Sequence, residues 1–407
     1  MTDQHVGQRI RALRKARSLT VQQLAGRASC STSLLQKVEN GSRPLTPGLL
    51  AQLAAAFHVG PEQITGQPYM GDAEPEDQAA IPELRRVLLT FDSPDDLGQP
   101  ARPLPVLAAE MDHVTQMRQD GQYVQMGALL PGLLTELTHV ALTARDEEQQ
   151  RRAYWWLARG YRATNSLAHK LGYHDMSLTA VERVHWAADR SGDPLMQVTA
   201  AYLRAGAMVR MGAFGSARRL LEALSGEVDR IASEEALTEP QLAVQGAVLL
   251  KLAIVEARDG RPEQAAQRLA EARAAAGMLR SDTTHYEMSF GPTNVRIHEV
   301  AAMIDMGDTE QALARLREWG AEQDRTEWEL PAGIAAERAS HHHIDVAAAR
   351  LTEGDRRGAF ADLAVARGIS PVHTRFHPTV RHTAEALVRL DRRQDDTIAG
   401  FARWAGV

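Results

Sequence analysis

Side chains able to form specific hydrogen bonds are grouped in one short stretch near the start of the chain. Thr32, Ser33, Gln36 and Lys37 follow one another at intervals that a helix places on one side. An amide can make paired hydrogen bonds with adenine and an ammonium group can donate to guanine, each worth about 1–3 kcal/mol of discrimination. The chemistry that these residues favour is the reading of base edges in a DNA groove.

Two short helices on either side of a tight turn must position these side chains. Residues 19–41 read LTVQQLAGRASCSTSLLQKVENG, with apolar residues at helical spacing in both halves. Thr20 followed by Gln23 has the form of a capping box, and Ser31 is placed to cap the second helix. Gly41 supplies the left-handed residue that ends it. The pattern predicts a helix-turn-helix.

Residues Val6 to Ile64 closely resemble the Cro/lambda-repressor type of helix-turn-helix, often called the XRE family. The resemblance rests on caps, turn and core positions together: Val6, Ile10, Leu13, Leu19, Leu24, Cys30, Leu35, Val38, Leu49, Leu53, Phe57 and Ile64. It implies an all-α chain with a five-helix DNA-binding domain over residues 1–66. The alternative is a small helical bundle with no role in DNA binding.

The resemblance also implies roles for individual residues. The second helix of the motif would contact bases through Thr32, Ser33, Gln36 and Lys37. The predicted DNA-backbone contacts are Arg9, Arg14, Gln22, Asn40 and Arg43. The family usually has Gln directly after the first cap, where this chain has Val21, so we expect a weaker phosphate clamp there.

Charge is divided unevenly along the chain. Residues 1–66 hold eight Lys/Arg and three Asp/Glu, a net of +5, whereas the whole chain carries −6 and residues 67–407 therefore carry −11. A basic head concentrates positive potential where phosphates would dock. We expect double-stranded DNA to bind the head and not the acidic body alone.

Composition narrows the class of protein. The chain has 407 residues, is 44% hydrophobic and only 5% aromatic, and has a single cysteine, so no disulfide can form within it. It lacks a run of about 18 apolar residues and a signal-peptide pattern at the N-terminus. We expect a cytoplasmic, nucleoid-associated protein without a membrane partner.

The body carries an internal repeat. After a polar linker over residues 67–104, which includes one amphipathic helix over 81–91, Gly212, Gly260, Gly307 and Gly354 recur at steps of 48, 47 and 47 residues. Five, nine and twelve residues after each glycine come small or apolar residues, and weaker copies begin at Gly121 and Gly172. A fixed period of this kind predicts an α-solenoid of helical hairpins over residues 105–407.

These hairpins resemble the tetratricopeptide repeat (TPR), although the period exceeds 34 residues and HEAT-like geometry is the competing interpretation. Such solenoids present a concave surface that can hold a peptide or small molecule. The candidate residues for that site are Trp156, Arg162, Asn165, Thr293 and Asn294. Core packing for the aromatic stretch and helix capping for Thr293 and Asn294 are the alternatives.

Signals for metal binding and catalysis are weak. His341, His342 and His343 are adjacent on a predicted helix, where they diverge by about 100° per residue and cannot meet at one ion. His298-Glu299 begins a zinc-protease pattern, but Ala302 replaces its second histidine. We predict no metal site, no cofactor and no enzymatic activity.

Chains that join such a head to helical repeats resemble peptide-sensing regulators and large actinobacterial regulators. The resemblance implies a homodimeric transcriptional regulator that reads a pseudo-palindromic operator, with DNA binding modulated by an effector on the repeats. The alternative is a protein- or peptide-binding adaptor whose head does not read promoters.

Overall fold

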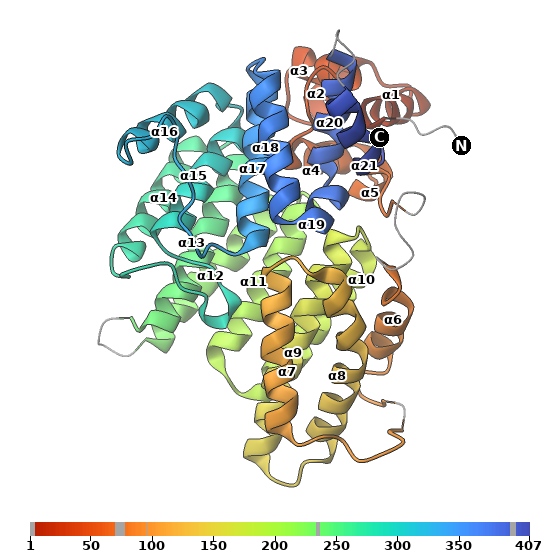
Figure 1. The fold of residues 1–407 in the computed structure, drawn as a ribbon, viewed down its shortest axis with the longest axis vertical. Coiled ribbons are helices and arrows are strands. Elements are labelled where there is room, and N and C mark those ends of the chain that lie inside the picture. Colours follow the sequence, from red (N-terminus) through yellow and green to blue (C-terminus); the bar gives the residue numbers. More distant parts are fainter. Residues whose placement is uncertain (1–4, 70–77, 95, 233–236, 391–395) are drawn as a thin grey trace.

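The computed structural model describes residues 5–69, 78–94, 96–232, 237–390 and 396–407. Within these ranges the chain is all-helical, and the one pairing of β type is an isolated bridge between Thr283 and Phe290. Figure 1 shows a head at one end, next to the C-terminal helices, and a long body of paired helices. The predicted all-α class is confirmed.

Five helices form the head: α1 (Val6–Ala16), α2 (Val21–Arg27), α3 (Thr32–Glu39), α4 (Pro47–Phe57) and α5 (Pro61–Thr65). The backbone N–H of Gln23 donates to Thr20 Oγ1 at 3.1 Å, and the Thr20 N–H donates to Gln23 Oε1 at 2.9 Å. Ser31 Oγ accepts from Leu34 N–H at 3.1 Å, which caps α3. Both predicted caps are present, so the turn between α2 and α3 is held at each end.

Apolar side chains from all five helices fill the head. Leu24, Leu35, Leu53, Phe57 and Ile64 are fully buried. Leu13, Leu19, Val21 and Cys30 are only half-buried at its margin. The residues predicted for the centre of the head core are therefore buried, and those predicted at its margin are partly exposed.

Helix α6 (Ile81–Leu89) belongs to the body core. Ile81, Leu84, Val87 and Leu88 are buried among residues of α8 (Tyr123–Thr143) and α10 (His174–Ser191). The sequence predicted this helix as part of a linker, but its apolar face is covered by the body. Residues 70–77 and 95 of that predicted linker lie outside the described residues.

Six helical hairpins make up the repeat-like region. They pair α7 (Leu104–Gln119) with α8, α9 (Glu147–Lys170) with α10, α11 (Pro194–Arg210) with α12 (Phe214–Ile231), α13 (Glu239–Arg258) with α14 (Pro262–Ala276), α15 (Pro292–Met306) with α16 (Thr309–Ala321), and α17 (Ala336–Thr352) with α18 (Arg356–Ile369). Each first helix is followed by a glycine with φ between 70° and 90°: Gly121, Gly172, Gly212, Gly260, Gly307 and Gly354. The left-handed backbone that glycine permits turns the chain into the second helix.

The residues at fixed intervals after these glycines form the seam of each hairpin. The residues five positions on, Ala217, Ala265, Ala312 and Ala359, have no exposed surface, and those nine positions on, Leu221, Leu269, Leu316 and Leu363, are also buried. Small residues let the second helix approach closely, and leucines fill the space beside them. The 47-residue pattern is therefore a packing pattern.

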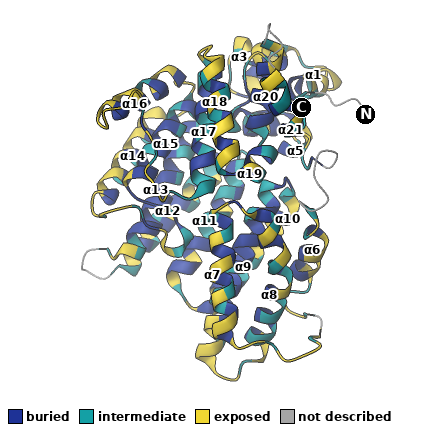
Figure 2. Ribbon diagram, in the orientation of Figure 1, coloured by how far each residue is buried: buried dark blue, intermediate teal, exposed yellow. Residues whose placement is uncertain are grey.

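The hairpins curl until the two ends of the array meet. Helix α7 of the first hairpin packs against α17 of the last. Three further helices, α19 (Pro371–Phe376), α20 (Pro378–Leu390) and α21 (Asp396–Ala405), then lead to the head (Figure 1). In Figure 2 the buried residues lie on the faces that helices turn to one another.

Helix α13 is long and apolar enough to cross a membrane by length and composition alone. Its most apolar window is 78% buried inside the protein, between neighbouring helices. Burial of that kind is expected for the central helix of a packed core, and here α13 is part of two apolar clusters.

Candidate nucleic-acid interface and the cavity behind it

The four predicted base-reading residues lie together on the outer face of α3. Thr32, Ser33, Gln36 and Lys37 are all exposed, whereas Leu35 and Val38 on the opposite face are buried. The buried residues fix the rotation of α3 about its axis, so the polar residues project away from the head. This face could enter a DNA groove without rearrangement of the helix.

A buried ion pair holds α3 against α1. Glu39 Oε1 accepts from Arg14 Nε at 2.6 Å and its Oε2 from Arg14 Nη2 at 2.9 Å, while Arg14 Nη1 donates to the Leu19 carbonyl at 3.0 Å. The hydrogen bond to Glu39 raises the pKa of Arg14. In this structure the donors of Arg14 are used inside the head, and its predicted contact with the DNA backbone stays a prediction.

Arg9 has a similar structural role. Its Nε donates to the Ile64 carbonyl at 2.8 Å and its Nη2 to the Thr65 carbonyl at 2.7 Å. A cation at the carboxyl end of a short helix satisfies carbonyls that have no partner within the helix. Arg9 therefore ties α1 to the end of α5, and its predicted contact with a phosphate stays a prediction.

The other predicted backbone contacts lie on the surface of the head and stay predictions. Gln22 and Asn40 are exposed and Arg43 is half-buried. Sequence reasoning missed two cations beside them. Arg11 Nη2 donates to Asn40 Oδ1 at 3.4 Å. Arg389 of α20 packs over the Cα of Gly41, at a point where a Cβ would lie 2.3 Å from its guanidinium.

A family model described as a helix-turn-helix domain matches residues 5–65. The head is a helix-turn-helix domain. Over 72 residues the chain is also 39% identical to an uncharacterized HTH-type transcriptional regulator, RghRB, of Bacillus subtilis (strain 168). That match covers 17% of this chain and 52% of RghRB, so the chain spans about half the length of this curated relative.

Two solved structures are similar in outline to larger parts of the chain. BtubC (BKLC) from P. vanneervenii has 16% identity and a TM-score of 0.36, over 57% of this chain and 90% of its own. PlcR of Bacillus thuringiensis, solved in complex with the peptide PapR7 and DNA, has 12% identity and a TM-score of 0.36, over 94% of this chain and 98% of its own.

A cavity of about 380 Å³ separates the helix-turn-helix domain from the body. The domain contributes Leu45, Pro47, Leu50 and Pro61 to its wall, and the body contributes residues of α9, α10, α11, α13, α15, α17, α19 and α20. We call this space the head–body cavity. A molecule bound in it would touch the helix-turn-helix domain and several helices of the body at once.

Helix α4 makes one of the direct contacts between head and body. Gln52 Nε2 donates to the Arg258 carbonyl at 3.2 Å, and Ala51 is buried in an apolar cluster of α11, α12 and α13. Arg258 Nε in turn pairs with Asp305 Oδ2 at 2.8 Å. Helix α4, which follows α3, is therefore fixed on the wall of the head–body cavity.

The predicted effector residues are divided between this region and the packed core. Arg162 and Asn294 line a second cavity of about 220 Å³, which shares Lys170, Tyr202 and Arg338 with the head–body cavity. The other three predicted residues do not line either cavity. Asn165 accepts from Ser177 Oγ at 2.8 Å, Thr293 N–H donates to Asp282 Oδ2 at 3.3 Å, and Trp156 stacks edge-on with Trp155.

In the structure these three residues take part in packing and capping, the alternatives stated for them above, and their role in an effector site stays untested. Asn165 joins α9 to α10, and Asp282 caps α15 by accepting from the backbone of Thr293 and Asn294. Arg159 lies over the Trp156 ring at 4.7 Å from its centroid, so this aromatic face is already covered by a cation. The sequence identified polar residues on inner helices but could not show which of them reach open space.

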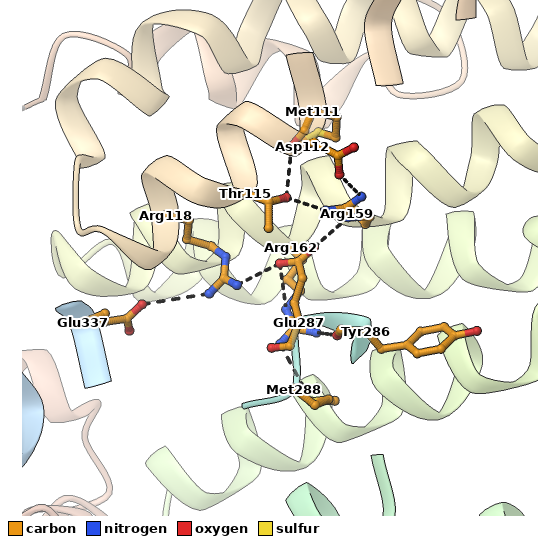
Figure 3. A network of polar contacts seen from close by, with 10 residues as sticks. All are labelled: Met111, Asp112, Thr115, Arg118, Arg159, Arg162, Tyr286, Glu287, Met288 and Glu337. Atoms are coloured by element: carbon orange, nitrogen blue, oxygen red, sulfur yellow. Dashed lines mark hydrogen bonds and ion pairs between the residues drawn. The ribbon is translucent and has the colours of Figure 1, made fainter. Parts of the chain in front are cut away.

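One carboxylate, that of Glu287, joins the loop before α15 to arginines of α7 and α9 (Figure 3). Glu287 Oε2 lies 2.9 Å from Arg118 Nη2, and Glu287 Oε1 lies 3.0 Å from Arg159 Nε. Arg162 Nε is 3.6 Å away, and Arg162 also donates to the Tyr286 and Glu287 carbonyls at 2.8 Å. Burial alone would raise the pKa of Glu287, but the three arginines hold it below its usual value.

The backbone at this anchor is strained. Tyr286 and Glu287 have φ values of 51° and 56°, a left-handed conformation that side chains other than glycine rarely adopt. Such a conformation costs about 1–3 kcal/mol per residue and persists only where surrounding contacts impose it. The arginine cluster supplies those contacts, so Glu287 locks the loop against α7 and α9.

Three histidines meet inside the head–body cavity, although not the three that are adjacent in sequence. Ligand nitrogens of His341, His373 and His377 lie within 4.8 Å of one another. Burial lowers the pKa of each of them, with nearby Lys170 adding to the effect, so the rings are neutral at pH 7. His342 instead packs against Trp328, and His343 Nδ1 lies 2.8 Å from Asp362 Oδ1.

The spacing of these ligand atoms makes the three rings a group that could hold a metal ion, although Lys170 places a positive charge beside them. The absence of a metal site stays a prediction. His341, His342 and His343 are directed to different partners in the fold. Sequence reasoning missed the spacing His373-x3-His377, which puts two rings on one side of the chain.

Proposed function

We propose that this protein is a sequence-specific DNA-binding transcriptional regulator. The observation that carries the proposal is the exposed polar face of α3 in a helix-turn-helix domain, with Thr32, Ser33, Gln36 and Lys37 presented together. The similarity of the chain to a regulator of Bacillus subtilis supports it. Gln22, Asn40 and Arg43 would hold phosphates beside the reading helix, with Arg11 and Arg389 as additional cations.

We also propose a homodimer. One helix-turn-helix domain covers a single half-site, and two domains related by two-fold symmetry read half-sites about 34 Å apart or a multiple of that distance. The acidic body would supply the dimer contacts and keep the domains in register. An effector would then regulate transcription by favouring one arrangement of the two domains.

The head–body cavity is the proposed effector site, because its occupant would contact both the DNA-binding domain and the solenoid. Arg162 and Asn294 in the adjoining cavity remain candidates for effector contacts. The alternative function is a protein-binding adaptor. It predicts DNA binding that barely responds to salt, because phosphate contacts would be missing.

Gln36→Ala is expected to relax the preference at one base position while leaving affinity for random duplex nearly unchanged. A bidentate contact from Gln36 would be worth about 1–3 kcal/mol of discrimination, or roughly 5–150-fold between bases. The measurement is binding of the full-length variant to operators that differ at single positions, selected first with the unaltered protein.

Gln22→Ala is the matched control, since it removes a similar exposed amide from α2. It should weaken binding to all sequences alike, because a phosphate contact carries no base information. If Gln36→Ala also weakens every sequence equally, Gln36 does not read bases and the proposed orientation of α3 is wrong.

A further inference from the structure

Three cations face the head–body cavity without a matching anion. Arg210, Lys251 and Arg338 all line it, and none of them has a carboxylate oxygen within 4.0 Å in the part of the chain that the structure describes. Burial lowers the pKa of Arg210 to about 10 and also lowers the pKa of Lys251. All three residues are only partly exposed. Charges that are largely removed from water are normally paired, so three such cations on one cavity wall are a departure that needs an explanation.

The cations converge on one part of the wall. Lys251 Nζ lies 3.3 Å and Arg210 Nη1 lies 3.6 Å from the point that a Cβ on Gly206 would occupy. Lys251 Nζ also sits 4.1 Å from the centroid of the Tyr202 ring. Arg338 raises the potential at Lys251 from the side of α17. Glycine at position 206 leaves room beside α11 for both head groups.

The carboxylates around the cavity are paired or only partly charged. Asp305 pairs with Arg258 at 2.8 Å, and Glu337 pairs with Lys170 at 2.8 Å. Burial, followed by the charge of Asp305, raises the pKa of Asp345 to about 7, and its Oδ2 lies 3.8 Å from His341 Nε2, so this group supplies only part of a negative charge at neutral pH. Among the described residues, no carboxylate therefore pairs directly with Arg210, Lys251 or Arg338.

An apolar patch of the wall comes from both domains. Leu45, Pro47 and Leu50 lie on the side of the helix-turn-helix domain, and Ile297 and Ile304 on α15. Histidines whose pKa is lowered by burial, among them His341, His373 and His377, line another part of the wall. A volume of about 380 Å³ lies in the range of small-molecule sites, near its lower end. The cavity thus combines cations with an apolar patch.

We propose that the head–body cavity binds a small organic anion, with its carboxylate or phosphate group held by Arg210, Lys251 and Arg338 and its apolar part seated against α4. This inference names the effector class for the proposed regulator and rests on that proposed function only for its biological consequence. The binding itself is a property of the folded chain and is measured without DNA.

The first experiment compares two fluorescent probes that differ in charge. 1-Anilinonaphthalene-8-sulfonate has an anionic group on an aromatic body, and N-phenyl-1-naphthylamine is the same body without that group. With full-length protein in the absence of DNA, we expect one sulfonate probe to bind per chain, at least about tenfold more tightly than the neutral probe. Inorganic phosphate should displace it. Equal affinity of the two probes would overturn the proposal.

The second experiment removes the cations one at a time. Lys251→Met, Arg210→Met and Arg338→Met are each expected to weaken binding of the sulfonate probe about tenfold or more and to leave the neutral probe unaffected. Arg204→Met, which changes an exposed arginine on the same helix as Arg210, is the matched control and should change neither affinity.

Thermal stability distinguishes a role of the cations in anion binding from a role in supporting the fold. Replacing Arg210 or Lys251 with an apolar side chain of similar length should raise the melting temperature of the free protein, because burial disfavours the charged form of both groups and that cost disappears. A lowered melting temperature with unchanged probe binding in all three variants would show that the cations support the fold. Failure of DNA binding would refute the proposed function and leave these results standing.

Discussion

Glu287→Gln is expected to lower the free energy of unfolding by about 3–5 kcal/mol, the cost of breaking a buried ion pair by removing one partner. Glutamine keeps the size of the side chain but removes its charge, which leaves Arg118, Arg159 and Arg162 facing one another around a buried site. Since the total free energy of unfolding of a protein is about 5–15 kcal/mol, this change should remove a large part of it. Urea denaturation followed by circular dichroism measures it.

An exposed carboxylate provides the control. Glu147 pairs with Arg151 at 3.2 Å on the surface of α9, and its side chain is 87% exposed. Glu147→Gln should change stability by no more than about 0.5 kcal/mol, because exposed pairs are screened by water. Equal effects of the two substitutions would show that Glu287 does not hold the loop before α15 in place.

The second large effect is a loss of stability in mild acid. Burial lowers the pKa of His298, His342, His377 and His382 to about 3, from 6.5 in the unfolded chain. Below about pH 6.5 the unfolded chain takes up protons that the folded chain cannot bind. Stability is therefore complete above that pH and is lost as the pH falls, by at most about 1.4 kcal/mol per pH unit for each histidine.

Asp345 opposes this trend. Its pKa is raised to about 7 in the folded chain, so it favours folding as the pH falls through the same window and offsets about one histidine. The balance of these four histidines and one aspartate predicts a loss of at least about 3 kcal/mol between pH 6.5 and pH 5.5, because His169, His341 and His373 also have lowered pKa values and add to it. Denaturant unfolding at the two pH values measures it.

One substitution tests whether a buried histidine is responsible. His342→Gln should make the stability less dependent on pH, since His342 is buried and unable to take up a proton in the folded chain. His113→Gln, at an exposed position on α7, should leave the dependence unaltered. Stability that is the same at pH 6.5 and pH 5.5 would contradict the neutral, buried state of these rings.

The sequence predicted local features well because local interactions decide them. The caps at Thr20 and Ser31, the exposed face of α3 and the glycine-led hairpins each depend on residues within one or two turns of one another. The repeat also gave the buried positions after each glycine, because a fixed spacing implies a fixed seam. These features were predictable from pattern and propensity.

Features that join distant segments were not predictable in the same way. Arg9 and Arg14 have side chains of the kind that bind phosphates, so the sequence alone makes them candidates for DNA-backbone contacts. Only the fold places Arg9 at the end of α5 and Arg14 beside Glu39. The solenoid curls until α7 meets α17, and that curvature creates the head–body cavity. The sequence pattern has a period but does not specify the angle between successive hairpins. For that reason it predicted Trp156 and Asn165 as effector-site residues and missed Arg210 and Lys251, which line the cavity.

The regulator proposal is tested most directly by selecting bound sequences from a random DNA pool with the full-length protein. We predict enrichment of a pseudo-palindrome with half-sites about 34 Å apart or a multiple of that, bound by two chains. We also predict that affinity for it falls steeply as salt rises from about 50 to about 200 mM. No enriched sequence, together with binding that is insensitive to salt, would contradict the account.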